Sequence, residues 1–556
     1  MTTQPQPWDF IYQELGIETP AFDEKPLSLY VEEHARNFPD FPALRYFSLD
    51  ISYRELNSLA NQLANVLVEM GVSKDDVVGF HMPNTPQYVL GFLAVAKIGC
   101  AGSGVSPLLA PAELEYQIRD AGISVMMSLD ALANSNLVGM ENCPDCLKGV
   151  LVAGVADFLA PSELQLPNMN GVRVESFLSM LNDASDEFVQ ADVHWNDTYL
   201  VQYTGGTTGK PKGAMLSVRN IIRCPATQHI FAPLEPGKDV FLTPFPMFHI
   251  AGTGAVVSGL RYGGCGILVP DPRDLEYMCD QMLASPPVYF GAVPTMFQML
   301  LKQEKFHQID FSKLKMAATG AAPLTADDRK KIEAVIGDNK LCDAFGMTET
   351  SPVYVVNPPQ RIKPTALGIP VPGADVKIVD VETGTKEMPV GENGEIITSG
   401  PHVMKGYLNL PEESAKALRK FNDKTWMYTG DVGFMDEEGY VSISDRAKDM
   451  LIVGGYKVFS VELEDKLNNL DFINNTAIIG VPDTERAGND VVNLFIELTE
   501  DATDQNRSEL EEQVIAFCRK NMSPYKVPKV IHFIDAIPLT AVGKIDKKVL
   551  REQVIT

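Results

Sequence analysis

The sequence predicts an α/β protein with a large N-terminal domain of doubly wound sheets, which includes a small β-rich subdomain, and a small α+β C-terminal domain. Three observations lead to this prediction. A chain of 556 residues is too long for one hydrophobic core. Helix-period and strand-period segments alternate from about Ser52 to Phe345, which is typical of parallel sheets covered by helices. Two different patterns then follow, which indicates further units.

The first helix of this alternation carries its own boundary signals. Ser52 and Glu55 have the spacing of a capping box, apolar residues then recur at helical spacing, and Gly71 ends the run. The apolar run 77–82 is short enough for a buried strand. The alternation continues with helices expected from Asn84 to Gly99 and over 112–121, and with strands expected at 123–128, 199–204, 239–243, 288–290, 314–318 and 341–345.

The pattern changes at Gly368 and again at Asp445. Short strand-like runs separated by Gly and Pro predict a β-rich subdomain over about 368–444, with strands at 374–379 and 394–398. We therefore expect an N-terminal domain over residues 1–444 and a C-terminal domain over 445–556. In the latter, helices are expected at 461–470 and 508–520, and strands at 477–481, 491–498 and 530–533.

Composition excludes several classes of protein. Hydrophobic residues make up 45% and charged residues 22%, which rules out a disordered chain, collagen or a coiled coil. The net charge of −26 repels nucleic acid and anionic membrane surfaces. The first residues have no leader-like pattern, and Lys97 interrupts the longest apolar stretch, so we expect a cytoplasmic protein without a transmembrane segment. A homo-oligomer is compatible with the sequence.

The segment YTGGTTGKPKG, Tyr203 to Gly213, is suited to binding a polyphosphate. Glycines and small hydroxyl residues leave backbone N–H groups accessible, and lysines add positive charge. The segment is not a Walker A loop, because Thr204 and Pro211 stand where that motif needs Gly and Ser or Thr. A flexible surface loop is the alternative interpretation.

Seven further segments, in a fixed order along nearly the whole chain, extend this pattern. They are FPMFHIAG from Phe245, ATGAAP from Ala318, DAFGMTET from Asp343, GEIITSGPHVMKGY from Gly394, YTGDVG from Tyr428, DRAKDMLIVGGYKV from Asp445 and PLTAVGKIDKKVL from Pro538. Together they resemble the adenylate-forming superfamily of acyl-CoA synthetases, adenylation domains and beetle luciferases, and within it the bacterial fatty-acid CoA ligases. The resemblance implies an enzyme that uses ATP, Mg²⁺ and coenzyme A to convert a carboxylic acid into its CoA thioester through an acyl-adenylate.

The resemblance also implies which residues bind the nucleotide and coenzyme A. Adenine is expected to lie against 320–323 and 343–347, and Asp431 to accept hydrogen bonds from both ribose hydroxyls. Arg446 is expected to reach the ribose or a phosphate, and Gly455 to leave room for the thiol of CoA. The full expected set is Thr204, Gly205, Gly206, Thr207, Thr208, Gly209, Lys210, Lys212, Gly320, Ala321, Ala322, Pro323, Asp343, Ala344, Phe345, Gly346, Met347, Thr348, Asp431, Arg446, Gly455 and Lys544.

The chemistry of such an enzyme requires cations. Attack of a carboxylate on the α-phosphate of ATP brings two anions together, so their charge must be neutralised. The resemblance assigns Mg²⁺ to Glu349 and Thr204, whose hard oxygens suit this ion. It makes Lys544 the lysine that bridges carboxylate and phosphate during adenylation. The expected catalytic residues are Lys544, Thr204, Glu349 and Lys210.

The sequence lacks a residue that one class of acid substrate would need. The run 245–248 contains no carboxylate that could pair with an α-ammonium group, so an α-amino acid is disfavoured. His249, Gly291 and Gly320 are expected to line the acyl pocket, although a histidine in such a stretch is equally a core residue. Apolar residues over 291–299 favour a medium- or long-chain fatty acid. An aryl or other small carboxylate, acyl transfer to a carrier protein, and a nucleotide sensor without turnover remain alternatives.

The C-terminal motif departs from some relatives. Lys448 resembles the hinge about which the C-terminal domain rotates before thiol transfer. The run 453–455 replaces a lysine-rich run of aryl-CoA ligases and luciferases, which leaves the contacts to the CoA phosphates open. Ile452 stands where luciferases have a catalytic lysine, so light production is disfavoured.

Overall fold

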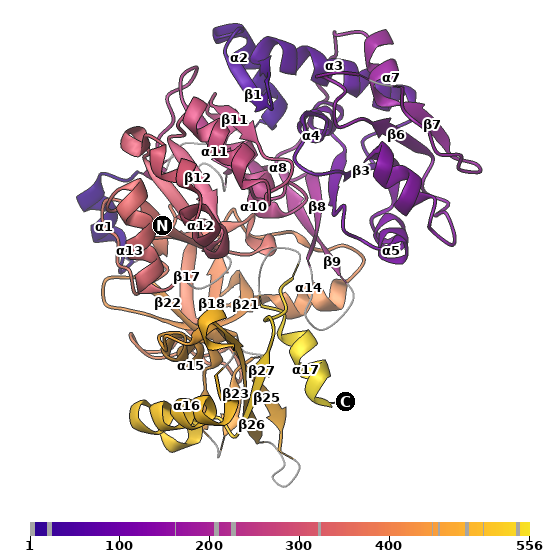
Figure 1. The fold of residues 1–556 in the computed structure, drawn as a ribbon. Coiled ribbons are helices and arrows are strands. Elements are labelled where there is room, and N and C mark those ends of the chain that lie inside the picture. The colour runs from indigo at the N-terminus through magenta and orange to yellow at the C-terminus, as the bar shows by residue number, and fades with distance from the viewer. Residues whose placement is uncertain are drawn as a thin grey trace.

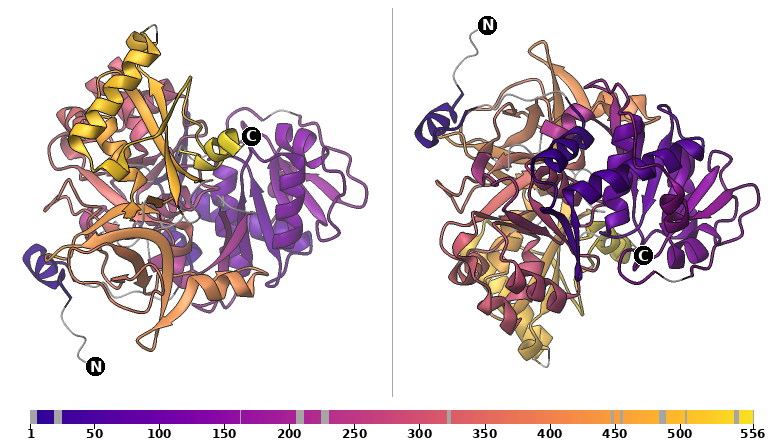
Figure 2. Two further views of the ribbon diagram at one scale, coloured as in Figure 1. Left: turned by 90° about the horizontal axis from the view of Figure 1, so that it is seen from below. Right: turned by 90° about the horizontal axis from the view of Figure 1, so that it is seen from above.

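The computed structural model describes residues 6–18, 25–161, 163–204, 211–223, 230–320, 324–446, 449–453, 456–483, 489–503, 505–540 and 545–555. It confirms the expected fold class, an α/β protein with a large N-terminal part and a small C-terminal part (Figure 1). The C-terminal part lies at the end of the molecule opposite α2 (Leu27–Asn37) and α3 (Tyr53–Glu69), as the views in Figures 1 and 2 show. Within these described ranges, no helix is long and apolar enough to cross a membrane.

One large sheet of the N-terminal part has the strand order β16-β15-β14-β13-β12-β10-β11-β1-β2 and is parallel from β14 to β1. Its strands are β1 (Pro42–Tyr46), β2 (Leu49–Ser52), β10 (Val240–Thr243), β11 (Cys265–Leu268), β12 (Tyr289–Ala292), β13 (Met316–Thr319), β14 (Leu341–Gly346), β15 (Val353–Val356) and β16 (Ile369–Pro370). The helical segments between them are α10 (Ile250–Arg261), α11 (Leu275–Ala284), α12 (Pro294–Leu301), η2 (Glu304–Gln308), η3 (Phe311–Lys313), α13 (Ala326–Ile336) and η4 (Thr348–Thr350).

The second large sheet has the order β19-β9-β8-β4-β3-β5-β6-β7. Its strands are β3 (Val77–His81), β4 (Ala101–Val105), β5 (Ile123–Leu129), β6 (Gly149–Ala153), β7 (Arg173–Ser176), β8 (Thr198–Thr204), β9 (Lys212–Ser217) and β19 (Gly406–Tyr407). The accompanying helical segments are α2 (Leu27–Asn37), α3 (Tyr53–Glu69), α4 (Pro86–Ile98), α5 (Pro111–Ala121), α6 (Asp130–Leu132), η1 (Ala133–Leu137), α7 (Phe177–Asp183) and α8 (Val218–Arg223).

An antiparallel sheet follows, with the order β17-β18-β21-β20 and β22 paired to β21. Its elements are β17 (Asp375–Val379), β18 (Gly394–Ser399), α14 (Pro411–Ala417), β20 (Leu418–Phe421), β21 (Lys424–Met435) and β22 (Val441–Arg446). The C-terminal part contains β23 (Leu451–Val453), β24 (Tyr456–Val458), α15 (Ser460–Leu467), β25 (Ile473–Pro482), β26 (Asp490–Leu498), η5 (Glu500–Ala502), α16 (Arg507–Asn521), η6 (Pro524–Lys526), β27 (Val530–Ile534) and α17 (Lys547–Ile555).

The local signals read from the sequence place most elements well. The capping box of α3 is present: the backbone N–H of Glu55 donates to the Ser52 hydroxyl, and the backbone N–H of Ser52 donates to the Glu55 carboxylate. The strand expected at 314–318 is shifted, because the short helix η3 occupies the residues just before Leu314 and delays β13 to Met316. The helix expected at 461–470 ends earlier, at Leu467.

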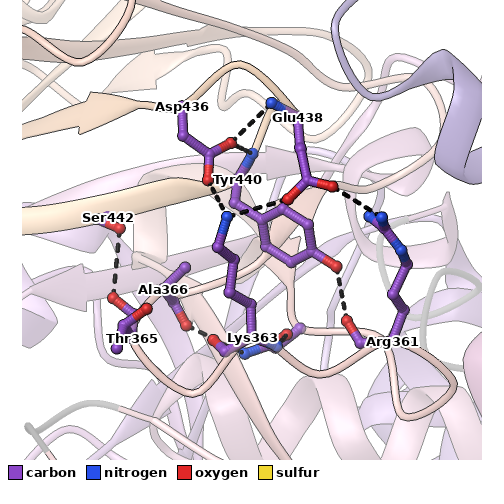
Figure 3. Close-up of polar contacts among 9 residues, drawn as sticks. Arg361, Lys363, Thr365, Ala366, Asp436, Glu438, Tyr440 and Ser442 are labelled. Carbon is purple, nitrogen blue, oxygen red and sulfur yellow. Dashed lines mark hydrogen bonds and ion pairs between the residues drawn. The ribbon is translucent and has the colours of Figure 1, made fainter.

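A polar cluster joins the segment before β16 to the turn between β21 and β22 (Figure 3). Arg361 pairs with Glu438 at 2.7 Å, and Lys363 pairs with both Asp436 and Glu438. The Tyr440 hydroxyl donates to the carbonyl oxygen of Arg361 at 2.6 Å. This cluster fixes the edge of the large sheet against the antiparallel sheet.

The N-terminal helix α1 (Asp9–Leu15) docks onto the same region. The Tyr12 hydroxyl donates to the carbonyl oxygen of Pro370, and the Arg361 guanidinium lies 5.3 Å from the ring centroid of Phe10. Trp8, which precedes the helix, is buried against Gly439. Residues at the start of the chain therefore complete the core around β16 and β22.

Buried His402 predicts a pH-dependent stability. Burial, and then the nearby charges of Lys424 and Arg223, lower its pKa to about 3. Below pH 6.5 the unfolded chain therefore binds a proton that the folded protein does not, and the free energy of unfolding should fall as the pH decreases. Glutamine can donate a hydrogen bond but does not titrate. Between pH 6 and 5, the free energy of unfolding of His402→Gln should therefore decrease less steeply than that of the wild type, by about 1.4 kcal/mol per pH unit. Urea unfolding at several pH values measures the difference, and parallel pH profiles for the two proteins would contradict it.

Candidate active site

The predicted phosphate loop connects two strands of a hairpin. Thr204 ends β8 and pairs across the hairpin with Lys212, which begins β9. The hairpin is held by α5: the Tyr116 hydroxyl donates to the carbonyl oxygen of Pro211 at 3.1 Å. The Tyr203 hydroxyl donates to the carboxylate at the C-terminal end of the same helix. Both ends of the loop are therefore fixed, and the loop residues 205–210 lie outside the described residues.

Glu349 lies beside this hairpin. It belongs to η4, which packs against β8 and β9, and its side chain is only 6% exposed. The Tyr407 hydroxyl donates to Oε1 of Glu349 at 2.7 Å. The structure thus brings Glu349 and the strand that ends at Thr204 together.

The oxygen atoms at this position fit a magnesium ion held jointly with a nucleotide. Among the described residues, no group of three or more His, Cys, Asp or Glu side chains could hold a metal by itself. Mg²⁺ commonly uses one or two carboxylates and completes its coordination with waters and substrate phosphates. The buried Glu349 carboxylate beside a phosphate-loop hairpin matches that mode of binding.

Lys212 is engaged in an ion pair. Its Nζ lies 2.5 Å from a carboxylate oxygen of Glu413 on α14, and 5.1 Å from the ring centroid of Tyr407. The Lys212 and Lys416 ammonium groups lower the pKa of the Glu413 carboxyl to about 2. The sequence motif does not predict this pairing, because Glu413 lies two hundred residues further along the chain.

The segments expected to contact adenine lie on adjacent strands. β13 and β14 are parallel neighbours, with Thr319 opposite Asp343. Asp343 pairs with the buried Arg329 of α13 at 2.6 Å and accepts a hydrogen bond from Asn357. Burial nevertheless raises the pKa of Asp343. Gly320 follows β13 at the carboxyl end of these strands, where ligands of open α/β sheets commonly bind.

Gly320 is needed for the close approach of these two segments. A Cβ atom at this position would lie 2.3 Å from the carbonyl oxygen of Ala344, which is backbone and cannot move aside easily. Gly320→Ala should therefore lower the free energy of unfolding by about 1–3 kcal/mol, as overpacking does. Gly291→Ala is the matched control, because its Cβ would make ordinary contacts at 3.5 Å with Phe245 and Tyr289. Urea unfolding compares them, and equal losses in the two variants would contradict the argument.

Asp431 lies near the same strands. It is 3% exposed on β21, and its charge contributes to the raised pKa of Tyr354 on β15. The Tyr354 ring is 5.5 Å from that of Phe345 on β14. Arg446 is the cross-strand partner of Asp431 on β22, and its side chain is outside the described part of the chain. Asp431 is therefore near the expected adenine segment.

His249 and the helix that follows it lie over the large sheet. His249 is the N-cap residue of α10, and its Nδ1 accepts a hydrogen bond from the backbone N–H of Ala251. A small cavity of about 10 Å³ lies along this helix. Its lining combines α10, β10, β12 and the segment before β10, and consists of Ala232, Leu234, Phe241, Ala255, Ser258, Gly259 and Tyr289. None of the described residues that line it is charged.

Other predicted site residues cannot be placed. Those outside the described residues are Gly205, Gly206, Thr207, Thr208, Gly209, Lys210, Ala321, Ala322, Pro323, Lys448, Gly455 and Lys544. Among the described residues, sequence reasoning missed the roles of Tyr407, Glu413 and Arg329 as partners of predicted site residues. For Tyr407 a signal existed, because it ends the motif that begins at Gly394.

Comparisons with known proteins identify the family of this chain. A sequence model described as AMP-binding enzyme matches residues 31–408, and one described as AMP-binding enzyme C-terminal domain matches residues 462–544. A long-chain-fatty-acid–CoA ligase of Bacillus subtilis is 34% identical over 99% of this chain and 98% of its own length. An Escherichia coli enzyme of the same name is 31% identical over 94% of this chain and 93% of its own.

A solved structure shares the whole architecture. The crystal structure of an anthranilate CoA ligase in complex with anthranoyl-AMP aligns with a TM-score of 0.82 at 26% identity, covering 95% of this chain and 97% of that one. The chain therefore belongs to the AMP-binding enzyme family, as an AMP-forming acyl-CoA synthetase.

Proposed function

We propose that this enzyme activates a medium- or long-chain fatty acid with ATP and Mg²⁺ and transfers the acyl group to coenzyme A, releasing pyrophosphate and AMP. The single observation that carries the fatty-acid assignment is the similarity to long-chain-fatty-acid–CoA ligases of Bacillus subtilis and Escherichia coli over at least 93% of each chain. The cavity along α10 has a mostly apolar lining, but its volume of about 10 Å³ has room for about one water molecule and does not hold an acyl chain. A cytoplasmic location stays a prediction from the sequence.

The proposed binding of the acid follows the direction of α10. His249 stands at the start of this helix, and Ser258 and Gly259 line the cavity about 15 Å further along its axis, at 1.5 Å per residue. We propose that the carboxylate lies near His249, Gly291 and Gly320 and that the alkyl chain extends between α10 and β12, where the lining side chains must move apart to admit it. Burial of each methylene in such a place contributes about 0.8 kcal/mol.

The proposed roles at the nucleotide rest on the sequence motifs and on the positions of Glu349 and Asp431. Asp431 accepts hydrogen bonds from the ribose hydroxyls, and the neighbouring strand β14, with Gly320, contacts adenine. Glu349 and Thr204 hold Mg²⁺, which supplies positive charge to the phosphate oxygens when bound. Lys210 and the backbone N–H groups of the phosphate loop orient the triphosphate, and Lys544 brings the carboxylate to the α-phosphate.

The two half-reactions are assigned to two arrangements of the C-terminal domain. We place the domain boundary at Asp445, with Lys448 as the hinge, and assign Arg446 to the ribose or phosphate and Gly455 to the approach of the CoA thiol. This assignment is carried by sequence motifs, because the residues at the hinge lie outside the described residues.

The alternative substrate is an aryl carboxylate. The anthranilate CoA ligase supports it, since a protein of the same fold is crystallised with anthranoyl-AMP. Acyl transfer to a carrier protein is a second alternative.

A panel of acids tests the proposal. Pyrophosphate release would be measured with saturated fatty acids of increasing chain length, with aryl acids and with small acids, in the presence of ATP and CoA. We expect the highest kcat/KM with a medium- or long-chain acid and a requirement for free CoA for thioester formation. Preference for an aryl acid would overturn the assignment of a fatty acid as substrate. Turnover only with an acyl carrier protein would overturn the assignment of CoA as acceptor. If no acid gives an acyl hydroxamate with ATP and hydroxylamine, the proposed enzyme activity itself is overturned.

A further inference from the structure

A tyrosine joins the proposed magnesium ligand to the phosphate-loop hairpin. The Tyr407 hydroxyl donates to Oε1 of Glu349 at 2.7 Å, and both side chains are buried. We propose that Tyr407 is a positioning residue, which holds the Glu349 carboxylate in the orientation that binds the magnesium ion of MgATP. This inference rests on the proposed function.

The chemistry of the donor suits this role. One carboxylate oxygen is occupied by Tyr407, and no described residue forms a hydrogen bond to Oε2. Among the described residues, Oε2 is therefore the Glu349 oxygen that could bind a cation. A tyrosine hydroxyl is neutral, so it orients the carboxylate without cancelling the negative charge that attracts the metal, as a lysine or arginine would.

The backbone around Tyr407 is fixed on both sides. Tyr407 pairs with Ala214 of β9, and the backbone N–H of Leu408 donates to the carbonyl oxygen of Gly213. The backbone N–H of Met404 donates to the carbonyl oxygen of Glu349 at 2.9 Å. The segment 404–408, which includes β19, thus carries hydrogen bonds to the hairpin and to η4, and sets the separation between the carboxylate and the hairpin.

The lysine beside the Tyr407 ring is paired with a carboxylate other than that of Glu349. Lys212 lies 5.1 Å from the centroid of the Tyr407 ring, and its ammonium group pairs with Glu413. Glu413 also pairs with Lys416. Among the described residues, the ion-pair partner of Lys212 is therefore Glu413.

Calorimetric titration of metal tests the inference without turnover. Mg²⁺ would be titrated into the full-length protein in complex with α,β-methylene-ATP, which cannot release pyrophosphate, with metal binding to the free analogue subtracted. Tyr407→Phe keeps the ring over Lys212 but removes the hydroxyl, and we expect it to weaken Mg²⁺ binding about 10-fold, in the range seen for loss of partners of metal ligands. Tyr53→Phe is the matched control, because it removes a buried hydroxyl that donates to the carbonyl oxygen of Gly264 at 2.8 Å. A change of less than twofold in Tyr407→Phe would overturn the inference.

A double variant and a replacement variant extend the test of Tyr407. In a Glu349→Gln background, Tyr407→Phe should cause no additional loss of Mg²⁺ affinity, and an additive loss would overturn the inference. If Tyr407→Phe does not fold, Ser414→Ala replaces it: this variant removes the hydroxyl that accepts from the Tyr407 backbone N–H at 2.8 Å. A threefold weakening is then expected, and unchanged affinity would overturn the inference.

The outcomes separate the inference from the proposed function. A wild-type protein that neither binds Mg²⁺ with the analogue nor forms acyl hydroxamate would overturn the proposed function. A wild-type protein that does both, with Mg²⁺ affinity reduced by Glu349→Gln but unaffected by Tyr407→Phe, would overturn only the role of Tyr407.

Discussion

Replacing Glu349 with Gln is expected to slow acyl-adenylate formation about 100- to 1,000-fold, the range found when one electrostatic contact to the transition state is lost. The change is nearly isosteric, and the amide oxygen can still accept the hydrogen bond from Tyr407. It removes the negative charge, however, and Mg²⁺ binds carboxylate oxygens in preference to neutral ones. Pyrophosphate exchange with ATP and a saturating acid measures the rate of this half-reaction.

The control for Glu349→Gln is Glu438→Gln. This variant makes the same chemical change in the polar cluster of Figure 3, where Glu438 pairs with Arg361 and Lys363. We expect its exchange rate to stay within twofold of wild type. An exchange rate for Glu349→Gln that matches the control would remove Glu349 from the proposed metal site.

Lys544→Ala is expected to lose about a hundredfold or more in adenylation, which corresponds to roughly 3 kcal/mol or more of lost transition-state stabilisation. The lysine is assigned to the carboxylate and the α-phosphate, so its effect should be confined to the first half-reaction. Conversion of synthetic acyl-adenylate and CoA to the thioester should change little. The two half-reactions are measured separately, by pyrophosphate exchange and by thioester formation.

A nearby lysine provides the comparison for Lys544. Lys548 lies on α17, is more than half exposed and is 3.9 Å from Glu552, so Lys548→Ala should leave both half-reactions near wild type. Normal pyrophosphate exchange by Lys544→Ala would refute its role, and equal loss of both half-reactions would refute its confinement to adenylation.

Much of the fold could be predicted because its signals are local. The capping residues of α3 and the apolar runs that form β3 and β5 are each encoded within a few positions. The order in which the strands pair was harder to predict from the sequence. The pairing of β19 with β9 joins Tyr407 to Ala214, residues almost two hundred positions apart, and no local pattern specifies it.

In the candidate site, too, residues in local motifs could be predicted, and residues that depend on distant contacts could not. Thr204, Glu349 and Asp431 could be predicted as site residues because each lies in a contiguous motif, and their roles stay predictions. Arg329 could not, because it stands among charged residues of α13 and looks like a solvated surface residue until the fold places it against Asp343. The size of the cavity along α10 depends on side-chain packing between distant segments, so the sequence could not provide it. The domain boundary at Asp445 and any self-association stay predictions.

The docking of α1 has a consequence for biosynthesis. Tyr12 bonds to Pro370, which is 358 positions later in the chain. At about 5–20 residues per second, the ribosome needs roughly 20–70 s to produce the partner after the helix itself has been made. During that interval Trp8 and Ile11, which are buried in the finished protein, have no native surface to cover them. The contact between α1 and β16 can therefore form only after residue 370 has been synthesised.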